Sequence, residues 1–200
     1  MKIKICGLFR EDDVGYVNQA KPDYIGFVFA ESRRKISPEC AAKLKKKLDG
    51  SITAVGVFAD ADIADIAALY KSGIIDAAQL HGGEDIGYID ALKAISGMTI
   101  IKAIKAEDIS DTERYARSGA DFLLFDGAAG GSGKPFDWKL LKNISKPFFL
   151  AGGIDLKNIQ AAAALSPAPY ALDVSSGAES GGLKDGDKIA ELVKMVRSVR

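Results

Sequence analysis

Residues 122–138 have the sequence FLLFDGAAGGSGKPFDW, which is the most informative stretch of the chain for its fold. Four apolar residues, 122–125, end on Asp126 and lead into a glycine-rich segment. A short apolar run bounded by turn residues is typical of a strand that is buried on both faces. A strand that stops at a carboxylate and opens into a glycine-rich loop indicates the edge of an active site.

Similar apolar runs recur along the chain, with helix-like patterns between them. We expect strands at residues 2–6, 24–29, 52–58, 77–80, 99–104, 122–126, 148–151 and 170–174. We expect helices at residues 12–20, 38–48, 63–72, 86–95, 108–118, 137–141, 156–165 and 187–199. Ser37 and Pro38 suit the start of the second helix, as an N-cap residue followed by proline at the first helical position.

Strands that alternate with helices predict parallel pairing through crossover connections. Eight repeats of about 25 residues leave room for a strand, a helix and short loops. This is the pattern of a (β/α)8 TIM barrel, an α/β fold. A doubly wound open sheet has the same local pattern, but the number of strands favours the barrel. No linker or low-complexity segment divides the chain, so we expect residues 1–200 to form a single barrel domain.

The composition limits the partners and the cellular setting. The formal net charge is zero, whereas nucleic-acid binding requires a basic face, so we expect no nucleic-acid partner. Cys6 and Cys40 form no CxxC pair, and His81 is the sole histidine, so we expect neither a metal site nor a disulfide framework. No apolar stretch resembles a signal peptide or the roughly 18 residues of a membrane span. These features predict a cytoplasmic protein without a membrane partner.

Two inward-pointing side chains are candidates for chemistry, because catalytic groups of barrels come from the C-terminal ends of the strands. Cys6 ends the first expected strand and shares a face with Lys4. It can be a small buried hydrophobe, a base or a nucleophile. Asp126 has the parity of Leu124, and it can cap the next turn or act as a general acid.

Other polar residues follow further strand ends. His81 follows the fourth strand, where a structural histidine fits better than a catalytic one. Asp173 shares a parity with Ser175, and we expect it to point inward as an acid that supports the reacting groups from behind. Arg34 lies in a basic run after the second strand. That run is either a solvated surface segment or the source of an arginine that binds a carboxylate.

Glycine and serine residues follow the last two strands. Gly152 and Gly153 come after strand seven, and Ser175, Ser176 and Gly177 come after strand eight. Loops at these two positions form the usual phosphate site of barrels, where backbone N–H groups face the anion. Together they predict a phosphorylated ligand.

The glycine-rich segment after Asp126 is flexible enough to form a lid. Gly131, Ser132 and Gly133 are its central residues, and we expect them to cover the ligand. An ordinary long loop is the alternative interpretation.

Several motifs, taken together and in order from residue 2 to about residue 195, resemble the phosphoribosylanthranilate isomerases of tryptophan biosynthesis. These motifs are KICG at 4–7, GFVF at 26–29, residues 32–38, QLHG at 79–82, residues 130–138, Gly152 with Gly153, and DVSSG at 173–177. The first and the last are the most distinctive.

The resemblance implies a (β/α)8 barrel that performs an Amadori rearrangement without metal or organic cofactor. Its substrate, a phosphorylated sugar, is N-(5-phosphoribosyl)anthranilate, and its product is 1-(2-carboxyphenylamino)-1-deoxyribulose 5-phosphate. By the same resemblance Asp126 is the general acid, Cys6 is the general base, and Arg34 binds the anthranilate carboxylate. The glycine and serine turns would hold the phosphate. The chain could be a monomer or a homodimer.

Other phosphate-binding barrels remain alternatives. A histidine-pathway aminoaldose–ketose isomerase typically pairs two aspartates, whereas the first strand here ends in Cys6. An indole-glycerol-phosphate synthase would need a lysine and glutamate set. A barrel that binds phosphate without catalysis would make the inward Cys6 and Asp126 accidental.

Overall fold

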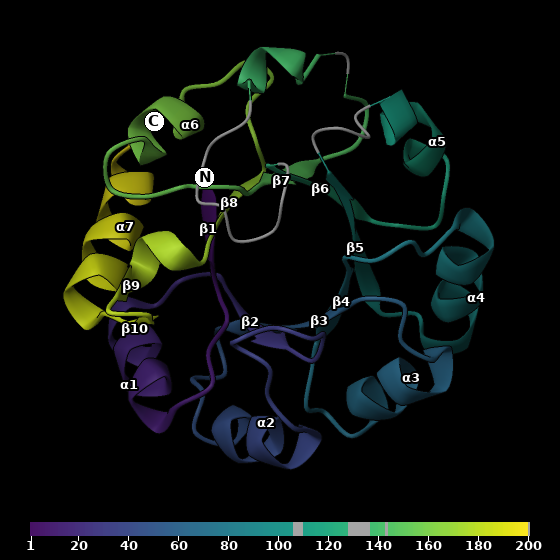
Figure 1. Ribbon diagram of the computed structural model, residues 1–200, viewed down its shortest axis with the longest axis horizontal. Helices are drawn as coiled ribbons and strands as arrows, with labels where there is room; N and C mark the ends of the chain where they lie inside the picture. Colours follow the sequence, from purple (N-terminus) through teal and green to yellow (C-terminus); the bar gives the residue numbers. More distant parts are fainter. Residues whose placement is uncertain (106–109, 128–136, 143, 200) are drawn as a thin grey trace.

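The computed structural model describes residues 1–105, 110–127, 137–142 and 144–199. Its centre is a closed barrel of parallel strands that follow one another in chain order, with β8 pairing back to β1. The helices lie outside this ring (Figure 1). The expected (β/α)8 barrel is therefore confirmed.

The strands agree with the expected ranges to within one residue at each end. They are β1 Lys2–Cys6, β2 Tyr24–Val28, β3 Thr53–Phe58, β4 Ala77–Leu80, β5 Thr99–Lys105, β6 Phe122–Asp126, β7 Phe148–Leu150 and β8 Ala171–Val174. Such agreement follows from their composition, because apolar and β-branched runs mark strands that are buried on both faces.

The helices differ more in length. They are α1 Glu11–Ala20, α2 Pro38–Lys45, α3 Ile63–Lys71, α4 Ile86–Ser96, α5 Thr112–Ala116, α6 Ile159–Ala163 and α7 Gly186–Ser198. The expected start of α2 is confirmed, because the Ser37 side chain accepts a hydrogen bond from Cys40 N at 3.2 Å. An additional pair of short strands, β9 Glu179–Ser180 and β10 Leu183–Lys184, follows β8 and was not expected.

Several expected helices were wrong in extent. The helix expected at 38–48 ends at Lys45, and the α-helix expected at 108–118 spans only Thr112–Ala116. The segment at 137–141 is only a 3-10 turn, η2 Trp138–Leu140, whose start is fixed by the Asp137 side chain accepting from Lys139 N. Residues 156–158 precede α6 instead of belonging to it, because the Asp155 carboxylate accepts from the backbone N–H groups of Lys157 and Asn158. Such side-chain bonds compete with regular helix at these positions.

The barrel interior changes from apolar to polar along the strands. Its N-terminal half is filled by aromatic and aliphatic side chains, with Tyr24, Phe122 and Tyr170 packed around the buried Phe149. Side chains two residues apart on a strand point the same way. A polar layer of Lys4, Gln79 and Asp173 therefore lies above this apolar half of the interior, toward the C-terminal ends of the strands. One further step along their strands leads to the rim of the barrel.

Candidate active site

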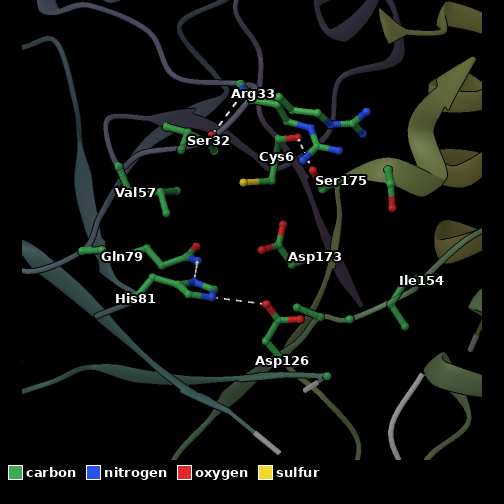
Figure 2. Close-up of a pocket in the computed structure, with 18 of the residues that line it drawn as sticks. Cys6, Ser32, Arg33, Val57, Gln79, His81, Asp126, Ile154, Asp173 and Ser175 are labelled. Atoms are coloured by element: carbon green, nitrogen blue, oxygen red, sulfur yellow. Dashed lines mark hydrogen bonds and ion pairs between the residues drawn. The ribbon is translucent and has the colours of Figure 1, made fainter. Parts of the chain in front are cut away.

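A cavity of about 770 Å³ opens at the C-terminal ends of the strands. Figure 2 shows Cys6 on one side of this space and Asp126 on the other, with Gln79 and Asp173 between them. Most of the expected site residues line it, and these are Cys6, Arg34, His81, Asp126, Gly152, Gly153, Asp173, Ser175 and Ser176. Most of the residues expected from the sequence to form a site therefore share one cavity.

Cys6 ends β1 and is 9% exposed. Burial raises the pKa of its thiol, Lys4 lowers it, and the Asp173 carboxylate raises it again, with a net shift upward. Ser175 Oγ donates a hydrogen bond to the Cys6 carbonyl at 3.1 Å, which ties the rim of β8 to that of β1. The site as described does not lower the pKa of the thiol, although a base at neutral pH would need that.

A buried ion pair lies directly below Cys6. Lys4 is 0% exposed, and its ammonium donates to Asp173 Oδ2 at 2.9 Å and to Gln79 Oε1 at 2.8 Å. Lys4 and Asp173 are register partners on adjacent strands. Asp173 Oδ1 has no hydrogen-bond partner among the described residues and is buried. A buried carboxylate oxygen without a partner is an exception in folded proteins, where buried polar atoms are normally hydrogen-bonded.

A second set of contacts leads from this layer to the acid. Gln79 Nε2 lies 2.9 Å from His81 Nδ1, and His81 Nε2 lies 3.2 Å from Asp126 Oδ2. The expected structural role of His81 fits these contacts, but the second contact also places the imidazole directly against the candidate acid.

The glycine turns approach other backbone segments closely. Gly152 has φ +82°, and a Cβ there would lie 2.3 Å from Gly127 N. Gly177 does not line the cavity, and a Cβ on it would lie 2.0 Å from the Ile154 carbonyl oxygen. Only glycine fits either position. Gly177 therefore joins the turn after β8 to the loop after β7.

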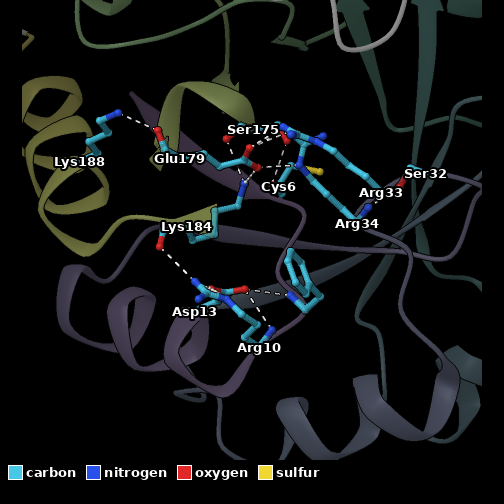
Figure 3. Close-up of polar contacts among 11 residues, drawn as sticks. Cys6, Arg10, Asp13, Ser32, Arg33, Arg34, Ser175, Glu179, Lys184 and Lys188 are labelled. Atoms are coloured by element: carbon cyan, nitrogen blue, oxygen red, sulfur yellow. Dashed lines mark hydrogen bonds and ion pairs between the residues drawn. The ribbon is translucent and has the colours of Figure 1, made fainter. Parts of the chain in front are cut away.

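Arg34 is already paired in this structure. Its Nε donates to Glu179 Oε1 at 2.6 Å and its Nη2 to Glu179 Oε2 at 3.1 Å. Lys184 donates to the same carboxylate at 2.8 Å and to the Ser175 carbonyl at 3.0 Å (Figure 3). Burial raises the pKa of Glu179, but hydrogen bonds from Arg34 and Lys184 outweigh it and the net shift is downward.

Other expectations concern residues or ligands beyond these contacts. Gly131, Ser132 and Gly133, the expected lid, lie outside the described residues. Within the described ranges no group of three or more His, Cys, Asp or Glu side chains is arranged to hold a metal ion. None of the described helices is both long and apolar enough to cross a membrane.

A family model for N-(5'-phosphoribosyl)anthranilate isomerase matches residues 3–195. The chain belongs to the phosphoribosylanthranilate isomerase family. The isomerase of Endomicrobium trichonymphae is 49% identical over 202 residues, covering 99% of each chain. The crystal structure of the Thermus thermophilus isomerase is 34% identical, with a TM-score of 0.88 over 100% of both chains.

A further solved isomerase carries a ligand. It is 29% identical, with a TM-score of 0.86 over 98% of both chains, and it is in complex with reduced 1-(o-carboxyphenylamino)-1-deoxyribulose 5-phosphate. Family membership confirms the resemblance seen in the motifs and makes the chain an isomerase of tryptophan biosynthesis.

No role was expected from the sequence for Lys4, for Gln79, which lines the cavity, or for Glu179 and Lys184, which connect Arg34 to Ser175. The orientation of Lys4 could have been predicted, because a side chain with the same strand parity as Cys6 points into the barrel. Glu179 carried no such signal, since its arginine partners, Arg34 and Arg33, are 145 and 146 residues away along the chain.

Proposed function

We propose that Asp126 and Cys6 divide the Amadori rearrangement of N-(5-phosphoribosyl)anthranilate between them. The observation that carries this proposal is that both side chains line one cavity from opposite sides, above the apolar half of the barrel interior. Ring opening requires an acid at the ring oxygen of the ribose, and isomerisation requires a base that removes the proton from C2 of the ribose. A carboxyl on β6 and a thiol on β1 suit the two tasks.

In the first step Asp126 donates a proton to the ring oxygen. The bond between that oxygen and C1 of the ribose breaks, and the anthranilate nitrogen lone pair forms an iminium with C1. In the second step the Cys6 thiolate removes the proton from C2, and the C2–H electron pair neutralises the iminium. The resulting enol–amine gains a proton at C1 and loses the proton of its C2 hydroxyl, which gives the ketone product.

Binding groups around the cavity fit the ends of this substrate. Arg34 is the proposed partner of the anthranilate carboxylate, since its guanidinium is fixed by Glu179 and borders the cavity. The phosphate is proposed to bind the backbone N–H groups around Gly152, Gly153, Ser175, Ser176 and Gly177.

The ligand of the related isomerase supports this orientation. It carries a carboxylate at one end and a phosphate at the other. The corresponding groups in this chain, Arg34 and the turn at Ser175, border the cavity and are joined through Glu179 and Lys184.

Turnover of two conservative variants tests the proposal. Cys6→Ser and Asp126→Asn keep the size of each side chain but remove the base or the acid. Each is expected to reduce kcat by about a hundredfold or more, because general acid–base catalysis contributes at least that factor. Cys40→Ser, a cysteine away from the cavity, is the control and should keep normal turnover. Near-normal kcat in either site variant would remove that residue from the mechanism.

A further inference from the structure

A continuous set of polar side chains joins the buried ion pair to the candidate acid. Lys4 contacts Gln79, Gln79 contacts His81, and His81 contacts Asp126. These residues come from β1, β4, the residue after β4, and β6. Figure 2 shows the last two of these contacts, which run from Gln79 through His81 to Asp126.

The orientation of the Gln79 amide follows from Lys4. An ammonium group has only donors, so it can bind only the oxygen of an amide. Burial lowers the pKa of Lys4, but Asp173 and Cys6 raise it, and the net upward shift keeps the ammonium charged. Gln79 is 2% exposed, and its oxygen therefore stays on Lys4. Its NH2 group consequently points to His81.

The orientation of Gln79 in turn fixes the proton of the imidazole. An amide NH2 has only donors, so His81 Nδ1 must accept its hydrogen bond and can carry no proton. The single proton of the neutral ring then lies on Nε2. Nε2 lies 3.2 Å from Asp126 Oδ2, so this N–H donates to that oxygen.

We propose that Gln79 is a positioning residue for the acid step, which sets the Nε2–H tautomer of His81 and so leaves Asp126 Oδ1 as the oxygen that delivers the proton. With Oδ2 accepting from His81, the transferable proton of the carboxyl resides on Oδ1. After proton transfer, the carboxylate keeps the His81 hydrogen bond, which stabilises the charge that remains. This inference rests on the proposed role of Asp126 as general acid.

The burial of Lys4 is explained better by a role in orienting the Gln79 amide than by a contribution to stability. Apolar side chains of similar volume are usually as stable as a buried ion pair, or more so. An ammonium at the floor of the barrel therefore requires another reason. Its contact with Gln79 Oε1 supplies one, since an apolar residue in its place would leave the amide free to flip.

The tautomer can be measured directly, because the chain has a single histidine. Its two ring nitrogens give one pair of ¹⁵N signals, and their long-range couplings to the ring protons show which nitrogen carries the proton. The wild type is expected to have an unprotonated Nδ1. In Gln79→Glu, a carboxylate replaces the amide NH2 as an acceptor, so Nδ1 is expected to become protonated. Gln160→Glu makes the same change at an exposed position and should match the wild type.

Kinetics provide the second readout. Gln79→Glu is expected to lower kcat by about tenfold or more, with a smaller effect on KM, while Gln160→Glu changes neither. Lys4→Met is a second variant that leaves Gln79 in place, and it is expected to give a mixture of both tautomers. If Gln79→Glu fails to fold, the wild-type and Lys4→Met spectra still decide the question.

Three results would overturn the proposal. The first is a proton on Nδ1 in the wild type, and the second is a Gln79→Glu or Lys4→Met spectrum that matches the wild type. The third is normal kcat in Gln79→Glu despite a changed tautomer. The ring signals do not depend on turnover, so a failure of Asp126 as the acid would appear separately, as near-normal kcat in Asp126→Asn.

Discussion

The guanidinium of Arg34 is held by the carboxylate of Glu179 through two hydrogen bonds, at 2.6 and 3.1 Å. Glu179 is 8% exposed and also accepts from the buried Lys184, which reaches the Ser175 carbonyl. One carboxylate therefore connects the proposed binding group for the anthranilate carboxylate with the proposed phosphate turn. This connection lies entirely at the rim of the barrel, away from Asp126.

Glu179→Gln is expected to weaken substrate binding more than it slows chemistry. The loss of a charged acceptor releases Arg34, so KM should rise by about tenfold to a hundredfold, with kcat much less affected. Steady-state kinetics measure both quantities. Glu191→Gln makes the same change at an exposed position of α7 and should leave KM unchanged. An unchanged KM in Glu179→Gln would contradict a role in holding Arg34.

The same carboxylate predicts a pH dependence of stability. Because the folded pKa of Glu179 is lowered, its contribution is fully present above the ordinary glutamate pKa of about 4.3. That contribution is lost as the pH falls through the lower folded value. The free energy of unfolding of the wild type should therefore decrease more steeply in acid than that of Glu179→Gln. Parallel acid profiles from urea titrations would argue against this assignment.

The thiol of Cys6 should titrate above an ordinary cysteine, whose pKa is about 8.5. Removal of the nearby ammonium in Lys4→Met should raise this pKa further, whereas Asp173→Asn should lower it. The charged groups that act on the Cys6 thiol are Lys4 on β1, Asp173 on β8 and Lys184 on β10.

The pH dependence of the rate of Cys6 alkylation measures this pKa, in a Cys40→Ser background so that only one thiol reacts. The two substitutions act in opposite directions, so a general loosening of the fold cannot account for both results. Shifts of the same sign in both variants would show that the ion pair does not control the thiol.

Gly177→Ala is expected to damage the proposed phosphate site. The new Cβ would lie 2.0 Å from the Ile154 carbonyl oxygen, so one of the two backbones must move. Displacement of a binding turn by about 1 Å can reduce kcat/KM by up to about a hundredfold. Gly15→Ala, in α1 with no atom within 4 Å of the new Cβ, should leave kcat/KM unchanged. Equal activity of the two variants would contradict the account.

A second buried ion pair supports the loop after β4. Lys102 and Glu84 lie 2.8 Å apart and are 2% and 1% exposed, and Glu84 also accepts from the backbone of Asp60 and Gly82. Lys102→Met should reduce the free energy of unfolding by about 3–5 kcal/mol, because it leaves a buried charge without its partner. Lys47→Met removes an exposed pair with Glu11 and should cost about 1 kcal/mol or less. Chemical denaturation measures both, and equal losses would contradict this view of the pair.

The barrel could be predicted because each of its strands is marked by residues that are close together in the sequence. The run 122–125 and its seven counterparts mark strands, and parity alone directs Cys6, Asp126 and Asp173 inward. Helix extents were less predictable, because side chains such as Asp155 bind the backbone and delay a helix by several residues. The short β9–β10 pair has too few residues to leave a periodic signal.

The connections between site residues depend on register and were not predictable from sequence. Lys4 and Gln79 are 75 residues apart, and Lys4 and Asp173 are 169 apart. The closed order of the strands determines which of these side chains meet. The sequence therefore indicated the residues of the cavity, but not that Arg34 is paired or that Gln79 orients His81.

A deuterium isotope effect tests the central claim most directly, that Asp126 opens the ring and Cys6 removes the C2 proton. The substrate is labelled with deuterium at C2 of the ribose, and kcat is compared with that of unlabelled substrate in Cys6→Ser and Asp126→Asn. Cys6→Ser slows proton removal, so a large primary isotope effect is expected. Asp126→Asn slows the earlier ring opening, so its isotope effect should be close to none. A large effect in Asp126→Asn, or none in Cys6→Ser, would contradict this division of roles.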